Sequence, residues 1–89
     1  MASYRIEWKN SAKKELRKLD RTVIPKIVAA VESLATTPHP EGHKKLQGSE
    51  HTYRIRIGDY RVVYSIEDQV LLIEIVKVGH RKNIYKKMS

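Results

Sequence analysis

The sequence predicts an α+β fold in which a helical hairpin packs on one face of a single sheet. Three observations lead to this prediction. An alternating segment opens the chain, two segments with helical spacing lie between residues 10 and 35, and three strand-like segments follow between residues 52 and 78. With 89 residues and no internal repeat, we expect one domain spanning residues 1–89 with one modest core.

Residues 4–9 predict the first strand, because apolar and charged side chains alternate along them. A short helix is expected next, with Asn10 or Ser11 as its N-terminal cap. The residues that form its buried stripe are Ala12, Leu16 and Leu19. The basic side chains of the same segment are expected on the opposite, solvated side of the helix.

A second helix is predicted over residues 24–35, where apolar side chains recur at helical spacing. Thr22 is expected to cap this helix. Pro25 then lies in the first turn, where its missing N–H has no helical partner to lose. This helix carries more apolar side chains than the first, so we expect it to be the main element that covers the sheet.

Residues 36–48 predict a loop, because prolines and glycines interrupt any regular pattern there. The loop contains His39 and His43. A metal site needs three or four converging ligands, so two histidines in such a loop do not predict one. We therefore expect no metal ion and no other cofactor.

A β-hairpin is predicted over residues 52–66, where two alternating segments flank the dipeptide Gly58-Asp59. A two-residue connection fixes the register, so Arg56 is expected opposite Arg61. The side chains that then share one face are Tyr53, Ile55, Ile57, Tyr60, Val62 and Tyr64, and those that share the other are Arg54, Arg56, Arg61 and Val63.

The arginine face of this hairpin allows two interpretations. Like charges directly opposite each other destabilise a strand pair, so the arginines are either a solvated surface or a site for an anion. Three arginines share the face with no acidic residue among them. The guanidinium group offers a planar fork of donors that matches phosphate and keeps its charge at neutral pH.

The last third of the chain predicts a turn, a strand and a basic tail. Residues 67–69 are expected to turn, and residues 70–78 to form a strand deep in the sheet that is covered on both sides for most of its length. Gly79 is expected to end this strand. His80, Arg81 and Tyr85 then lie where the strand edge meets the tail.

The composition indicates a polyanionic partner. Lys and Arg number 18 against 10 Asp and Glu, which gives a formal net charge of +8 and a pI near 9.9. Nucleic acid is the expected partner of so basic a short chain. The absence of cysteine excludes disulfides, and no apolar segment has the length of a membrane span or a signal peptide, so we expect a cytoplasmic protein without a membrane partner.

Three segments resemble the RelE branch of the RelE/ParE toxin superfamily. They are K-K-L-Q-G at 44–48, Y-R-I-R-I-G-D-Y-R-V-V-Y at 53–64 and V-G-H-R-K-N-I-Y at 78–85, and length, charge and element order agree as well. The resemblance implies a type II toxin that is paired with a RelB-like antitoxin. It also implies that the protein enters the A site of the 70S ribosome and cuts mRNA there.

By the same resemblance, the residues that cut RNA are Arg54, Arg56, Arg61, Arg81 and Tyr85. RelE proper has lysines at the first two of these positions. A lysine can act as a proton acceptor, whereas the arginines of this chain cannot. Arg61 and Arg81 are expected to stabilise the transition state, with Arg54 and Arg56 on flanking phosphates. Tyr85 is expected to stack on a base or to transfer a proton.

Several of these assignments have structural alternatives. His80 is either a second candidate for proton transfer or a simple strand-end residue. Arg81 is either a phosphate ligand or a partner in a surface ion pair. Tyr85 is either a functional residue or an anchor for the tail. Lys44 and Lys45 are expected to contact RNA backbone or solvent. For the whole protein, the alternatives to a nuclease are a ParE-like poison of DNA gyrase and a plain basic RNA-binding module.

Overall fold

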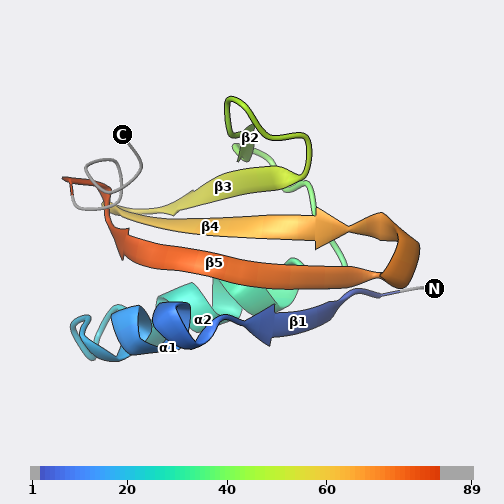
Figure 1. The fold of residues 1–89 in the computed structure, drawn as a ribbon. Helices are drawn as coiled ribbons and strands as arrows, with labels where there is room; N and C mark the ends of the chain where they lie inside the picture. The colour runs from blue at the N-terminus through green and yellow to red at the C-terminus, as the bar shows by residue number, and fades with distance from the viewer. Residues whose placement is uncertain (1–2, 83–89) are drawn as a thin grey trace.

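The computed structural model describes residues 3–82, in which two helices lie on one face of a five-stranded sheet (Figure 1). The predicted α+β class is confirmed. The elements in chain order are β1 (Arg5–Trp8), α1 (Asn10–Arg17), α2 (Ile24–Ser33), β2 (Lys44–Lys45), β3 (Thr52–Ile57), β4 (Tyr60–Glu67), a 3₁₀ turn (Asp68–Val70) and β5 (Leu72–His80).

The strands lie side by side in the order β1-β5-β4-β3-β2. The predicted meander of β3, β4 and β5 is present, and each of its pairs is antiparallel. β1 adds to its far edge as a parallel neighbour of β5, so the sheet is mixed. β2 was not predicted. It consists of Lys44 and Lys45, which carry no alternation of apolar and polar side chains that could have marked a strand.

The register of the β3–β4 hairpin is as predicted. Gly58 adopts a φ of +60°, which is readily available to glycine and allows the strands to reverse over two residues. Arg56 therefore pairs with Arg61, and Tyr53 pairs with Tyr64. The β4–β5 pairing shifts between Val63 and Tyr64, so that a bulge moves the register of β5 by one residue.

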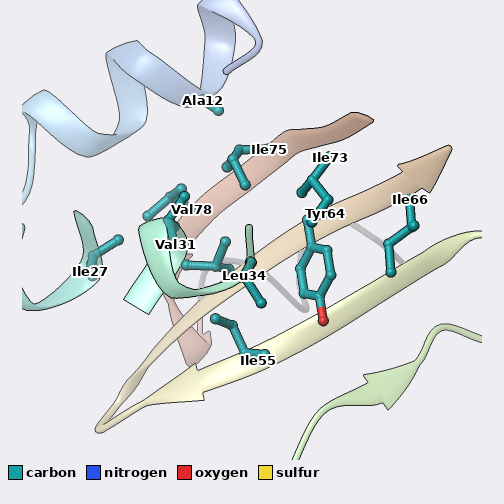
Figure 2. Close-up of a cluster of buried hydrophobic side chains, with 11 residues drawn as sticks. Ala12, Ile27, Val31, Leu34, Ile55, Tyr64, Ile66, Ile73, Ile75 and Val78 are labelled. Atoms are coloured by element: carbon teal, nitrogen blue, oxygen red, sulfur yellow. The ribbon is translucent and has the colours of Figure 1, made fainter. Parts of the chain in front are cut away.

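The core lies between the sheet and the two helices (Figure 2). From α2 and its C-terminal cap, Ile27, Val31 and Leu34 point toward the strands. The strand residues that meet them include Ile55, Val62, Tyr64, Ile66, Ile73, Ile75 and Val78. The Tyr64 hydroxyl donates a hydrogen bond of 2.9 Å to the carbonyl oxygen of Pro38, and burial together with the nearby Tyr53 raises its pKa to about 12.

The helix caps differ from the prediction. α1 begins at Asn10 after Lys9, so neither Asn10 nor Ser11 acts as a side-chain cap. Thr22 does not cap α2, whose cap position is Val23. Instead, the carboxylate of Asp20 accepts hydrogen bonds of 2.9 Å and 2.8 Å from the Thr22 N–H and hydroxyl, which lower the pKa of Asp20. Pro25 does lie in the first turn, as predicted.

β5 is covered on one face and not on both, so this part of the prediction was wrong. Ile73, Ile75 and Val78 are buried, whereas the residues between them are half-exposed. The reason is that α1 and α2 both pack on the same side of the sheet (Figure 1). No helix within residues 3–82 is long and apolar enough to cross a membrane.

Gly79 does not end β5. It pairs with Arg61, and the strand continues through His80, which pairs with Tyr60. β1 stops short of this region, and the side chain of Glu15 on α1 takes its place at the edge by accepting a 3.1 Å hydrogen bond from the Val78 N–H. The end of β5 is thereby fixed beside the β3–β4 turn, where the candidate site lies.

Candidate functional site

The sheet has an outer face, which we define as the face turned away from α1 and α2. Side chains alternate along a strand, and directly paired residues point to the same side. Because Tyr64, Ile75 and Ile6 belong to the core side, their neighbours belong to the outer face. The charged residues placed there by the register are Arg5, Glu7, Lys44, Arg54, Arg56, Arg61, Glu67, Glu74 and Lys77.

The outer face has two ends of opposite charge. At the basic end, beside the β3–β4 turn, the register collects Lys44, Arg54, Arg56, Arg61 and Lys77. At the acidic end, beside the β4–β5 turn, lie Glu7, Glu67 and Glu74 with Arg5. The ends of the sheet that carry them are separated by the length of the strands (Figure 1). An anionic chain is therefore attracted to one end of this face and repelled from the other.

Arg56 and Arg61 are directly opposite each other at the basic end. Arg56 is exposed, whereas Arg61 is only 5% exposed. One terminal nitrogen of Arg61, Nη1, donates to the carbonyl oxygen of Gly58 at 3.1 Å and to that of Tyr60 at 3.0 Å. The turn carbonyls thus orient the Arg61 guanidinium toward the turn.

A second basic row crosses the sheet next to this pair. Lys44 pairs with Arg54, Arg54 pairs with Val63, and Val63 pairs with Lys77. Lys44 is exposed, and Arg54 and Lys77 are half-exposed. Sequence reasoning did not select Lys77, because the bulge that brings it opposite Val63 leaves no clear signal in the apolar run of β5. Lys45 pairs with Tyr53 and therefore belongs to the other side of the sheet.

Arg81 lies at the same corner as the Arg56–Arg61 pair. It follows β5 directly, and its backbone N–H donates to the carbonyl oxygen of Asp59 at 2.9 Å. Its side chain is exposed. The hairpin turn therefore contacts both the guanidinium of Arg61 and the main chain of Arg81. Asp59 contributes an exposed carboxylate to the turn itself.

His80 is not brought to the arginines. Its pairing with Tyr60 places it on the core side of the sheet, where the two rings meet edge to face with centroids 5.5 Å apart. There it lines a surface pocket of about 360 Å³ together with Glu15 of α1 and Lys18, which directly follows α1. The expected role of His80 in RNA cleavage has no support in this placement. Tyr85, the other candidate for proton transfer, lies outside the described residues.

Comparison with known proteins identifies the family. Residues 6–85 match the family described as the ParE toxin of the type II toxin-antitoxin system parDE. The chain belongs to the RelE/ParE superfamily of type II toxins. It is 30% identical over 93% of its length to toxin RelE of Mycobacterium tuberculosis, of which it covers 87%. It is 29% identical over 90% of its length to the mRNA interferase toxin RelE of Escherichia coli, of which it covers 85%.

A solved structure of a superfamily member shows the same fold. The archaeal RelE–RelB complex from Pyrococcus horikoshii superimposes with a TM-score of 0.79 at 30% identity, over 89% of this chain and 96% of that one. The predicted resemblance to this toxin superfamily is therefore confirmed, and the RelE-named relatives agree with the RelE branch that the sequence motifs indicated.

Proposed function

We propose that this toxin is a ribosome-dependent endoribonuclease that cuts mRNA in the A site and so stops translation. The observation that carries the proposal is the basic end of the outer face, where Arg56 and Arg61 oppose each other beside Arg81. The name of the Escherichia coli relative, an mRNA interferase, supports the same activity.

The basic end favours an anionic ligand on energetic grounds. A directly opposed like-charge pair weakens a hairpin, by an amount on the order of 0.2–1 kcal/mol if it mirrors the gain from an opposite-charge pair. A bound phosphate would reverse the sign of that contribution, because each guanidinium can donate two parallel hydrogen bonds to its oxygens.

The proposed reaction is a transesterification within the RNA strand. The 2′-oxygen attacks the adjacent phosphorus as its proton leaves, and the bond from phosphorus to the 5′-oxygen breaks. The products are a 2′,3′-cyclic phosphate and a 5′-hydroxyl that takes up a proton. The phosphorane between them carries extra negative charge, and guanidinium groups placed around it lower the barrier.

Arg61 and Arg81 are assigned to this phosphorane, and Arg54 and Arg56 to the flanking phosphates, where Lys44 adds a further cation. In the unbound protein the Arg61 side chain is almost fully buried. The assignment therefore requires Arg61 to gain accessibility when RNA binds, while Arg56 and Arg81 are exposed beforehand. The guanidinium groups cannot accept the 2′ proton. Tyr85 is proposed for proton transfer. Alignment of the mRNA by the ribosome contributes part of the rate enhancement, because it positions the reacting groups.

An antitoxin is the second proposed partner. The Pyrococcus horikoshii relative was solved as a RelE–RelB complex, and the net charge of +8 of this chain favours an acidic or amphipathic antitoxin segment. Such a segment would inhibit the toxin by covering the basic end. Action on ribosomes places the proposed activity in the cytoplasm.

The chemistry is proposed to use no metal ion, since the phosphorane charge is balanced by guanidinium groups. Sulfur substitution of a non-bridging oxygen of the scissile phosphate tests this. A metal-free reaction predicts that adding Mn²⁺ or Cd²⁺ gives no selective rescue of the slowed phosphorothioate substrate. Selective rescue by either thiophilic ion would show that a metal contacts that oxygen.

Gyrase poisoning is the competing function, because the family that matches residues 6–85 is described by the name ParE. Primer extension on a translated mRNA, run together with an assay for trapped gyrase–DNA complexes, separates the two functions. The nuclease predicts cuts in phase with codons that disappear in Arg61→Ala and Arg81→Ala. Intact mRNA with trapped gyrase complexes would support the competing function.

A matched control is available on the same face of the sheet. Arg5 and Arg56 are both exposed arginines of the outer face, at its acidic and basic ends respectively. Arg5→Ala should leave the codon-phased cuts intact, whereas Arg56→Ala should weaken them. Equal losses in the two variants would show that total charge, and not the basic end, determines activity.

A further inference from the structure

An open pocket lies at the β3 edge of the sheet, next to the basic end of the outer face. It measures about 330 Å³ and is lined by β3, by the loop before β2 and by the C-terminal half of α2. Its lining includes Lys44 and Arg56, two of the cations of the basic end. Small-molecule sites start at about 300 Å³, so the pocket has room for one nucleobase.

The main chain of Arg56 is open toward this edge. The Leu46 N–H donates to the carbonyl oxygen of Thr52 at 2.8 Å, so the main chain of Thr52 faces β2. Alternate residues of an antiparallel strand face the same neighbour, so the N–H and C=O of Arg56 point to this side as well. Gly42 would stand opposite Arg56, but β2 begins only at Lys44, and Gly42 turns with a φ of +87°. One donor and one acceptor of the sheet edge are therefore available to a ligand.

The side chains of the pocket add two hydrogen-bond acceptors. The carboxylate of Glu41 is exposed, and no ion pair or hydrogen bond engages it within residues 3–82. The Ser33 hydroxyl donates its hydrogen to the carbonyl oxygen of Ala30 at 2.8 Å, so its oxygen can only accept from a ligand. Together with the Arg56 carbonyl, the pocket thus offers three acceptors, and these call for a ligand that carries N–H groups.

The rest of the lining is apolar. Ile55 is buried, and Ile57 and Ala30 are partly buried against the core. These side chains offer apolar surface to the face of a flat ring. A phosphate is disfavoured inside the pocket, because the Glu41 carboxylate would repel it. The pocket therefore suits an uncharged ring with N–H groups, whereas the guanidinium groups beside it suit the phosphates.

We propose that this pocket holds one base of the bound RNA and selects a base with an exocyclic amino group over uracil. The Glu41 carboxylate accepts from the amino group of the base, as carboxylates do from the N4 amino group of cytosine. The Arg56 N–H donates to the neighbouring ring acceptor. Uracil presents a carbonyl oxygen where cytosine has its amino group. A carboxylate that faces this oxygen gains no hydrogen bond and loses water, so uracil binds more weakly.

This inference rests on the proposed function in one respect, namely that RNA phosphates lie on the basic end. Arg56 then contacts the strand twice, with its guanidinium on a phosphate and its main chain on a base. Because Arg56 is directly opposite Arg61, the selected base belongs to a nucleotide near the scissile phosphate. The consequence is a base preference at one position beside the cut.

The test compares two 2′-O-methyl oligonucleotides, one of uridine only and one with a single central cytidine, by fluorescence anisotropy with the full-length chain. Neither can be cut, because the 2′-oxygen is blocked, and the two bases are of equal size. The wild-type chain should bind the cytidine probe at least about fivefold more tightly. Glu41→Gln should reduce this preference to less than twofold. Glu50→Gln removes the same charge from an exposed residue outside the pocket and should keep the preference.

Three results would overturn the proposal. They are equal or undetectable binding of the two probes by the wild-type chain, an undiminished preference in Glu41→Gln, and an equal loss of preference in Glu50→Gln. The first is measured on the wild-type chain, so a variant that fails to fold does not prevent the test. Cleavage of translated mRNA is measured separately. Codon-phased cuts together with equal affinity for the probes would retain the nuclease and remove the base pocket, and the opposite pair of results would do the reverse.

Discussion

The two faces of one sheet are built on different principles, although the same strands supply both. The core face holds apolar side chains such as Ile73, Ile75 and Val78, which pack against α1 and α2 (Figure 2). The outer face holds charged side chains that are segregated by sign along the strands. Burial determines the first face and stabilises the fold. The charged side chains of the outer face take no part in the packing of the core.

A second contrast lies within the outer face. At the acidic end, Arg5 and Glu7 form an ion pair of 3.2 Å, so the charges there are partly neutralised within the protein. At the basic end, Arg56 has Arg61 directly opposite. Glu7 and Glu74 are also directly opposite each other at the acidic end, so the two ends differ in the sign of their charge and in the Arg5–Glu7 ion pair.

The largest effect on stability is expected from the core face. Ile73→Ala removes a fully buried side chain and should lower the free energy of unfolding by about 2–5 kcal/mol. Arg5→Ala, on the outer face, should change it by no more than about 0.5 kcal/mol. Urea denaturation followed by circular dichroism measures both. Equal effects would mean that the two faces do not differ as described.

Tyr64 gives the next effect, which depends on pH. Its folded-state pKa of about 12 lies above the ordinary value of 10.0. The contribution of the protonated phenol to the free energy of unfolding is therefore fully present below pH 10 and is lost as pH rises through 12. At about 1.36 kcal/mol per pKa unit, this decrease in the free energy of unfolding approaches about 3 kcal/mol. Denaturation of wild-type and Tyr64→Phe protein between pH 9 and pH 12 measures it. The free energy of unfolding should fall more steeply with pH in the wild-type protein than in Tyr64→Phe. Parallel curves of unfolding free energy against pH would contradict the assignment.

The smallest effect sharpens the contrast between the two ends of the outer face. Removal of one like charge in Arg56→Ala should raise the free energy of unfolding by about 0.2–1 kcal/mol relative to Arg5→Ala. The same variant should bind single-stranded RNA more weakly, with the slope of log affinity against log salt reduced by about 0.7. Urea denaturation and RNA binding at several salt concentrations measure the two effects. A destabilised Arg56→Ala, or an unchanged salt slope, would remove the argument for a phosphate site.

Much of the fold could be predicted because a few residues determine it locally. Gly58-Asp59 set the turn length, and the turn length set every pair in the β3–β4 hairpin, including Arg56 with Arg61. The alternation of Tyr60, Val62 and Tyr64 then identified the core face. The resemblance placed Arg81 at the same corner as the hairpin, where its backbone contacts Asp59.

Other features depend on contacts that a linear pattern does not contain. β2 is a strand because Lys44 and Lys45 pair with β3, and not because of their side chains. Gly79 stays within β5 because Arg61 lies opposite it, and the same register carries His80 away from the arginines. His39 and His43 are hydrogen-bonded at 3.3 Å, and both rings pack against Tyr53, which lies ten residues further along the chain from His43.

The central claim is that the basic end of the outer face contacts the scissile RNA phosphate. Single-turnover cleavage of mRNA on programmed ribosomes tests it most directly, with ribosome binding measured in parallel. Arg81→Ala should lower the cleavage rate by about 10²–10³-fold while ribosome binding stays within a few-fold of wild type. Arg5→Ala should leave both unchanged. A cleavage rate that falls only in proportion to binding, or that falls equally in Arg5→Ala, would contradict the claim.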